Sequence, residues 1–168
     1  MCAGFGGDTG IGKWRFSIKN TFQHRDTEIR SYTENIYKDM AELEYNNISK
    51  RIINAAIEVH KELGPGLLES VYEYCLLDEL KRSGLYAERQ IQLPINYKGK
   101  KLDKEFVIDI LVENKVILEL KSVEMILPIH EFQLLTYLKL SGMKLGLLIN
   151  FNVPQLKDGI RRKINGTL

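Results

Sequence analysis

Three residues in the second half of the chain, Asp109, Glu119 and Lys121, carry side chains suited to metal-assisted hydrolysis. Asp109 interrupts the apolar run from Phe106 to Val112. A carboxylate in a buried strand is costly unless it is paired or bound to a cation. A Lys or Arg partner, or an exposed position on an edge strand, would also explain this acid, so Asp109 alone leaves both interpretations open.

Glu119 and Lys121 belong to the run Val-Ile-Leu-Glu-Leu-Lys, which has the character of a short strand. Side chains alternate across a strand, so we expect Glu119 and Lys121 on one face and Leu118 and Leu120 on the other. An acid-x-Lys triplet is common on surface strands. Its position at the end of an apolar strand makes this one more informative.

The register of the expected hairpin joins these observations. If residues 113–115 form a three-residue loop, Val112 pairs with Val116 and Asp109 lies opposite Glu119 on the same face. A two-residue loop would place Asp109 opposite Leu120 instead. In the first register two carboxylates repel each other unless a cation lies between them.

Two carboxylates with water suit Mg²⁺ or Mn²⁺, which prefer hard oxygen ligands. Such an ion polarises a phosphoryl oxygen and helps to deprotonate water. Lys121 would add positive charge beside that water or the developing phosphorane. The three residues therefore predict hydrolysis of a phosphodiester bond.

The elements that must position these residues follow from hydrophobic period and from turn residues. We expect an α/β fold, a small mixed four-stranded sheet flanked by helices, in the order α-α-β-β-β-α-β-α. The expected helices cover residues 46–63, 67–83 and 128–140, with a last helix opened by Pro154. The expected strands cover residues 89–97, 106–112, 116–121 and 145–150. Pro94 indicates that the first strand lies at an edge.

Residues 1–45 differ from the remainder, since a Gly-rich start is followed by a stretch without an evident buried face. We expect a poorly ordered N-terminal extension, followed by one folded domain over residues 46–168. Met40 as the natural start is a further hypothesis.

Residues on three of the expected helices are secondary candidates. Gln133 and Tyr137 are four residues apart and could overhang the site, or they could fill a helix–sheet seam. Glu69 could add a ligand, or it could only favour a helix N-terminus. His60 could be a ligand, although a lone helical histidine is more often structural.

Composition restricts the remaining possibilities. The net charge of +2 argues neither for nor against nucleic acid. Of the basic clusters at residues 98–104 and 161–163, each taken alone fits a solvated face better than a binding site. No apolar run is long enough to span a membrane, and Cys2 and Cys75 fit no metal or disulfide pattern. We therefore expect a cytoplasmic protein without membrane association.

The segment from Gly66 to Tyr72, GLLESVY, matches the signature G-x-x-E-x-x-Y and so resembles the GxxExxY protein family. The segments IINAAIEVHKELGPGLLESVYE, VILELKSVE and EFQLLTYLKLSGMKLGLLINFNVP also resemble that family. The likeness covers about Asn46 to Gly166. This family is placed in the PD-(D/E)xK nuclease superfamily, so the resemblance implies a restriction-endonuclease-like fold.

The resemblance also implies roles for single residues. Asp109 takes the place of the first acid, although Ile108 precedes it where the name pattern has Pro. Glu119 and Lys121 take the E-x-K, and the implied metal ligands are Asp109, Glu119 and the backbone carbonyl of Leu120. Gln133 and Tyr137 match the Q-x-x-x-Y motif of the RecB-like branch. Glu69 resembles an acid that the superfamily carries on a helix, and His60 is matched to a histidine that lies early in the sequence of the RecB-like branch.

Two functions follow as hypotheses. The first is a metal-dependent nuclease that uses Mg²⁺ or Mn²⁺ and acts on nucleic acid, with DNA favoured. The alternative is a catalytically silent module that binds nucleic acid or protein on a nuclease scaffold. The edge strand at residues 89–97 and the apolar helices make a homodimer or a partner protein a further hypothesis.

Overall fold

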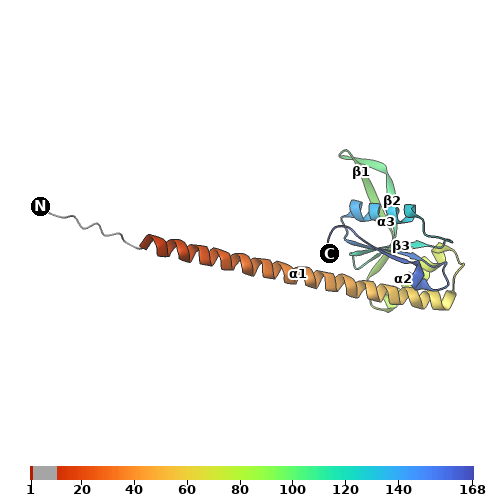
Figure 1. The fold of residues 1–168 in the computed structure, drawn as a ribbon. Helices are drawn as coiled ribbons and strands as arrows, with labels where there is room; N and C mark the ends of the chain where they lie inside the picture. The colour runs from red at the N-terminus through yellow and green to blue at the C-terminus, as the bar shows by residue number, and fades with distance from the viewer. Residues whose placement is uncertain (2–10) are drawn as a thin grey trace. The chain divides into compact units, whose positions relative to one another are not determined.

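The computed structural model describes Met1 and residues 11–168, with side chains for Met1 and for residues 30–168 except 96, 97 and 104. The chain divides into two compact units, Met1–Met40 and Ala41–Leu168. The second unit contains the whole sheet (Figure 1). No helix in the described part of the chain is long and apolar enough to cross a membrane.

Helix α1, Ile11–Leu63, begins far earlier than the helix expected near Asn46. Residues 11–45, expected to be poorly ordered, are therefore helical, whereas residues 2–10 lie outside the described part of the chain. The stretch contains no proline and only one glycine, so nothing interrupts the backbone hydrogen bonds. Its side chains at residues 30–40 are all exposed, which is why no hydrophobic period predicted the helix.

The sheet has five strands in the order β1-β2-β3-β4-β5. The pair β3 and β4 is parallel, and the other neighbouring pairs are antiparallel. Helix α3 connects the two parallel strands. The strands are β1 Ala87–Tyr97, β2 Lys100–Val112, β3 Val116–Lys121, β4 Leu145–Asn150 and β5 Ile160–Ile164, and the other two helices are α2 Glu69–Arg82 and α3 Pro128–Ser141.

Helices cover both faces of the sheet, as the predicted class requires (Figure 1). One core lies between the sheet and helices α1 and α2, and its central side chains include Ile52, Leu76 and Leu118. A smaller core lies between the sheet and α3, around Ile117 and Leu138. Alternation along β3 therefore sends Leu118 and Leu120 towards α1 and α2, while Glu119 shares the α3 face with Ile117.

The fifth strand replaces the helix that Pro154 was expected to open. Only a single 3-10 turn, Leu156–Gly159, forms there, and β5 then pairs with β4. Gly159 explains the difference, because a Cβ at this position would lie 2.2 Å from the backbone oxygen of Asn150. The glycine thus permits a close backbone approach that starts a strand, and the predicted final helix and four-stranded count were wrong.

The β1–β2 hairpin extends well past the rest of the sheet. Strand β2 pairs with β3 only over Ile110–Val112, so its first ten residues have β1 as their sole described strand neighbour. Lys98 and Gly99 form the turn at the tip, both with positive φ. The hairpin rises beyond α3 in Figure 1. The edge position predicted from Pro94 is confirmed, and the pairing shifts register between Pro94 and Asn96.

Candidate active site

The β2–β3 loop sets the register on which the site depends. Val112 pairs with Val116 across the three-residue loop 113–115, as predicted. Glu113 and Asn114 adopt positive φ values of 53° and 52°, which lets the chain reverse in so few residues. The ladder then ends at the pair Ile110 and Leu118, one residue short of Asp109 and Glu119.

Asp109 continues this ladder with its side chain. Its Oδ2 accepts a hydrogen bond of 2.7 Å from the backbone N–H of Leu120. The bond supplies the partner that the diverging backbone of β2 no longer provides. It also holds the Asp109 carboxylate against the end of β3, beside Glu119.

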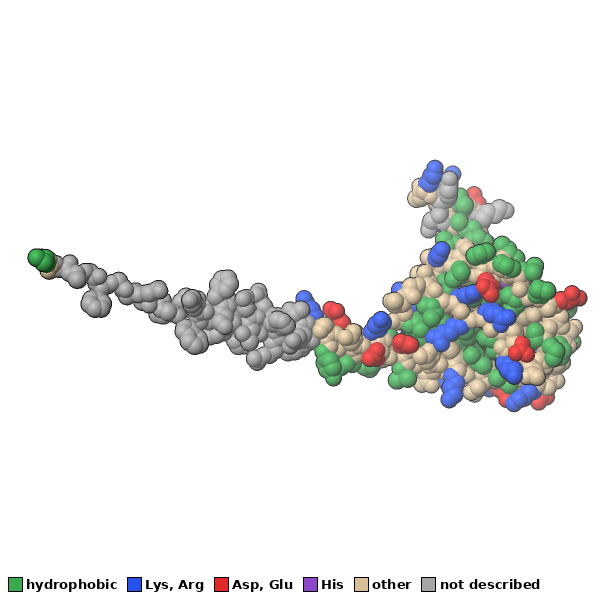
Figure 2. Space-filling model, in the orientation of Figure 1, with side chains coloured by type: hydrophobic (Ala, Val, Ile, Leu, Met, Phe, Trp, Pro, Cys, Tyr) green, Lys and Arg blue, Asp and Glu red, His purple; other side chains and the backbone are tan. Residues whose placement is uncertain are grey.

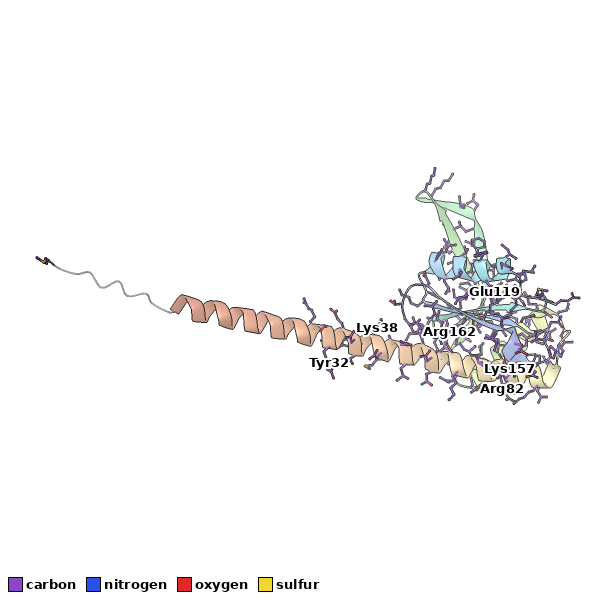
Figure 3. All side chains as sticks on the ribbon, viewed as in Figure 1. Tyr32, Lys38, Arg82, Glu119, Lys157 and Arg162 are labelled. Atoms are coloured by element: carbon purple, nitrogen blue, oxygen red, sulfur yellow. The ribbon has the colours of Figure 1, made fainter. Side chains whose placement is uncertain are left out.

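Glu119 is buried, with 1% of its surface exposed. Its Oε1 accepts a hydrogen bond of 2.6 Å from Lys121 Nζ, whereas its buried Oε2 has no hydrogen-bond partner among the described residues. Figure 3 labels Glu119 within the folded unit, near α3. A buried carboxylate oxygen without a donor is unusual in a folded protein, so this oxygen is available to a ligand such as a cation.

Lys121 connects the acids of the site. Besides Glu119, its Nζ donates to the carbonyl of Leu120 at 2.7 Å and lies 3.7 Å from Oε1 of Glu69. Burial lowers the pKa of Lys121, but the neighbouring carboxylates outweigh burial, so the net effect is a raised pKa. The ammonium group is thus firmly charged and contacts two of the predicted metal ligands, Glu119 and the Leu120 carbonyl.

Both central carboxyls have raised pKa values. Burial, opposed by the Leu120 hydrogen bond and by Lys121, raises the pKa of Asp109 to about 6. Burial together with the negative charge of Asp109 raises the pKa of Glu119 to about 7, despite the Lys121 ammonium. Two acids that burial and neighbouring carboxylates keep from ionising easily are typical of a functional site.

Glu69 reaches this cluster through a loop held by a tyrosine. Tyr72 is completely buried, and its hydroxyl donates to the Gly64 carbonyl at 2.7 Å and accepts from the Leu67 N–H at 3.1 Å. Its ring stacks on Phe151 at 4.4 Å. These contacts fix the turn that precedes α2, so Glu69 at the start of that helix is held beside Lys121.

Gln133 and Tyr137 lie on α3, on the face turned to the site. Gln133 Nε2 donates a hydrogen bond of 2.8 Å to the Tyr137 hydroxyl, so the hydroxyl hydrogen can be donated elsewhere. Burial raises the pKa of Tyr137, and the charges of Glu119 and Asp109 add to that effect, which shows that the ring lies within their field.

A model of the PD-(D/E)XK nuclease superfamily matches residues 46–163. The chain belongs to that superfamily. No curated protein sequence matches the chain. Among solved structures, the crystal structure of SSO0001 is similar, with 28% identity and a TM-score of 0.42 over 60% of this chain and 51% of that chain. The match therefore spans about half of SSO0001.

Within this PD-(D/E)XK domain, His60 stands apart from the other predicted residues. Its Nε2 is 2.8 Å from the Val153 carbonyl, and its ring lies near Phe151. Neither contact joins His60 to Asp109 or Glu119. The hydrogen bond instead connects α1 to the segment between β4 and β5.

One residue near the PD-(D/E)XK site was not predicted from the sequence. Glu73 is buried one turn after Glu69, and it is bound by Arg89 Nη1 at 3.1 Å and by Gln90 Nε2 at 2.9 Å. Its charge contributes to the raised pKa of Asp109. The four-residue spacing of Glu69 and Glu73 would have placed both on one face of the helix, but only the fold brings that face towards β2.

The donor set fits a hard divalent cation. The unpartnered Glu119 Oε2, the second carboxylate oxygen of Asp109 and the Leu120 carbonyl are oxygen ligands of the kind that Mg²⁺ and Mn²⁺ prefer. Among the described side chains, no group of three or more His, Cys, Asp or Glu residues could hold a metal by itself. The backbone carbonyl and water would therefore have to complete the coordination.

Proposed function

We propose that this PD-(D/E)XK domain is a metal-dependent nuclease that hydrolyses phosphodiester bonds of nucleic acid, with DNA the favoured substrate. The observation that carries the proposal is the Glu119 carboxylate, buried with one oxygen unpartnered and placed between Asp109 and Lys121. A purely structural acid at this position would be expected to satisfy both oxygens.

We propose Mg²⁺ or Mn²⁺ as the cofactor, held by Asp109, Glu119 and the Leu120 carbonyl, with Glu69 available through water. When bound, the cation supplies positive charge that polarises the phosphoryl group and makes water more acidic. Asp109 and Glu119 ionise near neutral pH, so both are available as charged ligands in ordinary buffers.

The protein's own groups act on the phosphate and on water. The Lys121 ammonium, half-enclosed by Glu119 and Glu69, supplies a fixed charge for a non-bridging oxygen or orients the attacking water. Gln133 donates to the Tyr137 hydroxyl oxygen, which leaves the hydroxyl hydrogen available for donation to the substrate phosphate. Such preorganised donors are typically worth about 10²–10³ in rate.

A cleavage assay tests the proposal. The full chain is incubated with labelled single- and double-stranded DNA and RNA in Mg²⁺ or Mn²⁺, beside Lys121→Met and Lys115→Met variants. Both lysines form an ion pair, but Lys115 lies at the opposite end of β3, with Glu44 as its partner. We expect Lys121→Met to lose at least about 10²-fold in rate and Lys115→Met to keep wild-type rates.

Equal activity in the two variants would refute the mechanism. Absence of cleavage by the wild type on every substrate, together with absence of Mn²⁺ binding in calorimetry, would favour the silent binding module instead.

A further inference from the structure

A pocket of about 320 Å³ lies directly beside the proposed active site, between β2 and α3. Its lining is mostly apolar and aromatic. Gln133 and Tyr137 belong both to this lining and to the proposed catalytic cluster, so the pocket shares two side chains with that cluster. The lining residues are Phe106, Ile129, Phe132, Gln133, Thr136 and Tyr137.

Aromatic rings form the walls of the pocket. The Phe106 ring lies 5.3 Å from that of Tyr137, inclined by 48°, and both come from elements that also carry the site. Phe132 is 61% exposed and Ile129 is 64% exposed, one turn apart on α3. A large exposed aromatic side chain beside a polar reaction site is suited to binding a flat ligand by stacking.

Positive charge lies along the same hairpin. Lys98, Lys100 and Lys101 are exposed at the tip of β1–β2, where Figure 2 shows a cluster of basic side chains. Lys101 is eight residues from Asp109 on β2, so its Cα is at most about 27 Å from that of Asp109. Phosphates of a strand leaving the site along β2 would meet these lysines.

We propose that the pocket binds an unpaired base of a nucleic-acid strand whose phosphate occupies the Asp109, Glu119 and Lys121 site. This inference rests on the proposed function and specifies its substrate as single-stranded nucleic acid or a single-stranded end. The base stacks on Phe132 and Phe106, and the lysines at the hairpin tip bind the phosphates that follow.

The need for an unpaired base follows from the chemistry of the lining. In a duplex both faces of a base are covered by its neighbours, so a ring can reach a face only where the base has left the stack. Duplex contacts also run mainly through charge to the phosphates. The surface next to the site instead offers Phe132, Ile129 and Phe106.

Binding measurements in EDTA isolate this contact from cleavage. Fluorescence anisotropy with a labelled short oligothymidylate and with the matching duplex compares wild type, Phe132→Leu, Phe132→Trp and Tyr86→Leu. Tyr86 is a control aromatic, 51% exposed and at the opposite end of the sheet. Because Phe132 is exposed, leucine keeps the fold and an apolar side chain but removes the ring.

We expect Phe132→Leu to weaken binding of the single strand by roughly 5- to 50-fold with little effect on the duplex. Phe132→Trp should bind as well as wild type or better, and Tyr86→Leu should be unchanged. An abasic unit in place of the contacted base should weaken binding of the single strand by the wild type. It should not weaken binding by Phe132→Leu any further, because both changes remove the same contact.

Three results would overturn the inference. The first is an unchanged affinity of Phe132→Leu for the single strand, and the second is an equal loss on the duplex. The third is a concentration-dependent mass that Phe132→Leu abolishes, which would make the pocket a contact between copies of the chain. Cleavage by the wild type in any of these cases leaves the proposed function intact, whereas a wild type that neither binds nor cuts any nucleic acid refutes both.

Discussion

Replacing Glu119 with glutamine should stabilise the protein at alkaline pH while abolishing the proposed nuclease activity. The pKa of this carboxyl is about 7 in the folded state, against an ordinary value of 4.5. Between these two values the folded protein holds a proton that the unfolded chain has released, so stability is full below about pH 4.5 and falls as the pH rises through 7. Glutamine cannot ionise and should remove this loss.

The magnitude follows from the same two values. A difference of about 2.5 between the folded and ordinary pKa corresponds to about 3 kcal/mol at high pH, since each pKa unit is worth about 1.4 kcal/mol. Lys121 loses a charged partner in the variant, although the glutamine oxygen can still accept its hydrogen bond. We therefore expect a gain of about 1–3 kcal/mol at about pH 8 and little difference below the ordinary pKa of 4.5.

Urea denaturation in EDTA, followed by circular dichroism from about pH 4 to about pH 8.5, measures this gain. Glu58→Gln is the control, because Glu58 pairs with Lys61 on the surface with more than half of each side chain exposed, and its loss should change stability by less than about 1 kcal/mol. When Mn²⁺ replaces EDTA, the wild type should become more stable than Glu119→Gln, because only the wild type is stabilised by the ion. A Glu119→Gln variant that is no more stable than wild type at alkaline pH would refute the buried-charge argument.

Three other predictions concern the same region. In differential scanning fluorimetry, Mn²⁺ should raise the melting temperature of the wild type at about pH 8 but not at about pH 5. At about pH 5 the two carboxyls, with pKa values of about 6 and 7, are protonated and cannot serve as charged ligands. The melting temperature of Asp109→Asn should not respond to Mn²⁺ at either pH. Tyr72→Phe keeps the stacked ring but loses both hydroxyl hydrogen bonds, so chemical denaturation should show a loss of about 1–2 kcal/mol, with slower cleavage as Glu69 loosens. Gly159→Ala should cost at least about 2 kcal/mol in the same assay, because its Cβ would meet the Asn150 backbone and not a movable side chain.

Much of the site was predictable because, in paired strands, the spacing of residues along the sequence determines which side chains are neighbours. The bounds of β3 and β4 agree with the strands expected at residues 116–121 and 145–150, and the three-residue loop is confirmed. Counting residues back from that loop therefore placed Asp109 beside Glu119. The spacing did not show that Asp109 would bind the Leu120 N–H, because that bond depends on β2 leaving β3 after Ile110.

The errors came from segments where local preference and tertiary context disagree. Pro154 suggested a helix, but the close approach at Gly159 is a property of the fold that the sequence does not display. The pairing of Glu73 with Arg89 and Gln90 likewise depends on which face of α2 meets β1. Long-range contacts of this kind have no periodic signal.

The two central acids differ in what they reveal about related chains. Asp109 holds the end of β3 through the Leu120 N–H, so a descendant without catalytic activity would still have a structural reason to keep it. Glu119 Oε2 has no hydrogen-bond partner among the described residues, and burial raises the pKa of this carboxyl, so a lineage without the proposed activity should gain stability at alkaline pH by losing it. Under the proposed function, a related chain that retains Glu119 is therefore expected to be active, and one with an apolar or amide residue there is expected to be inactive but more stable.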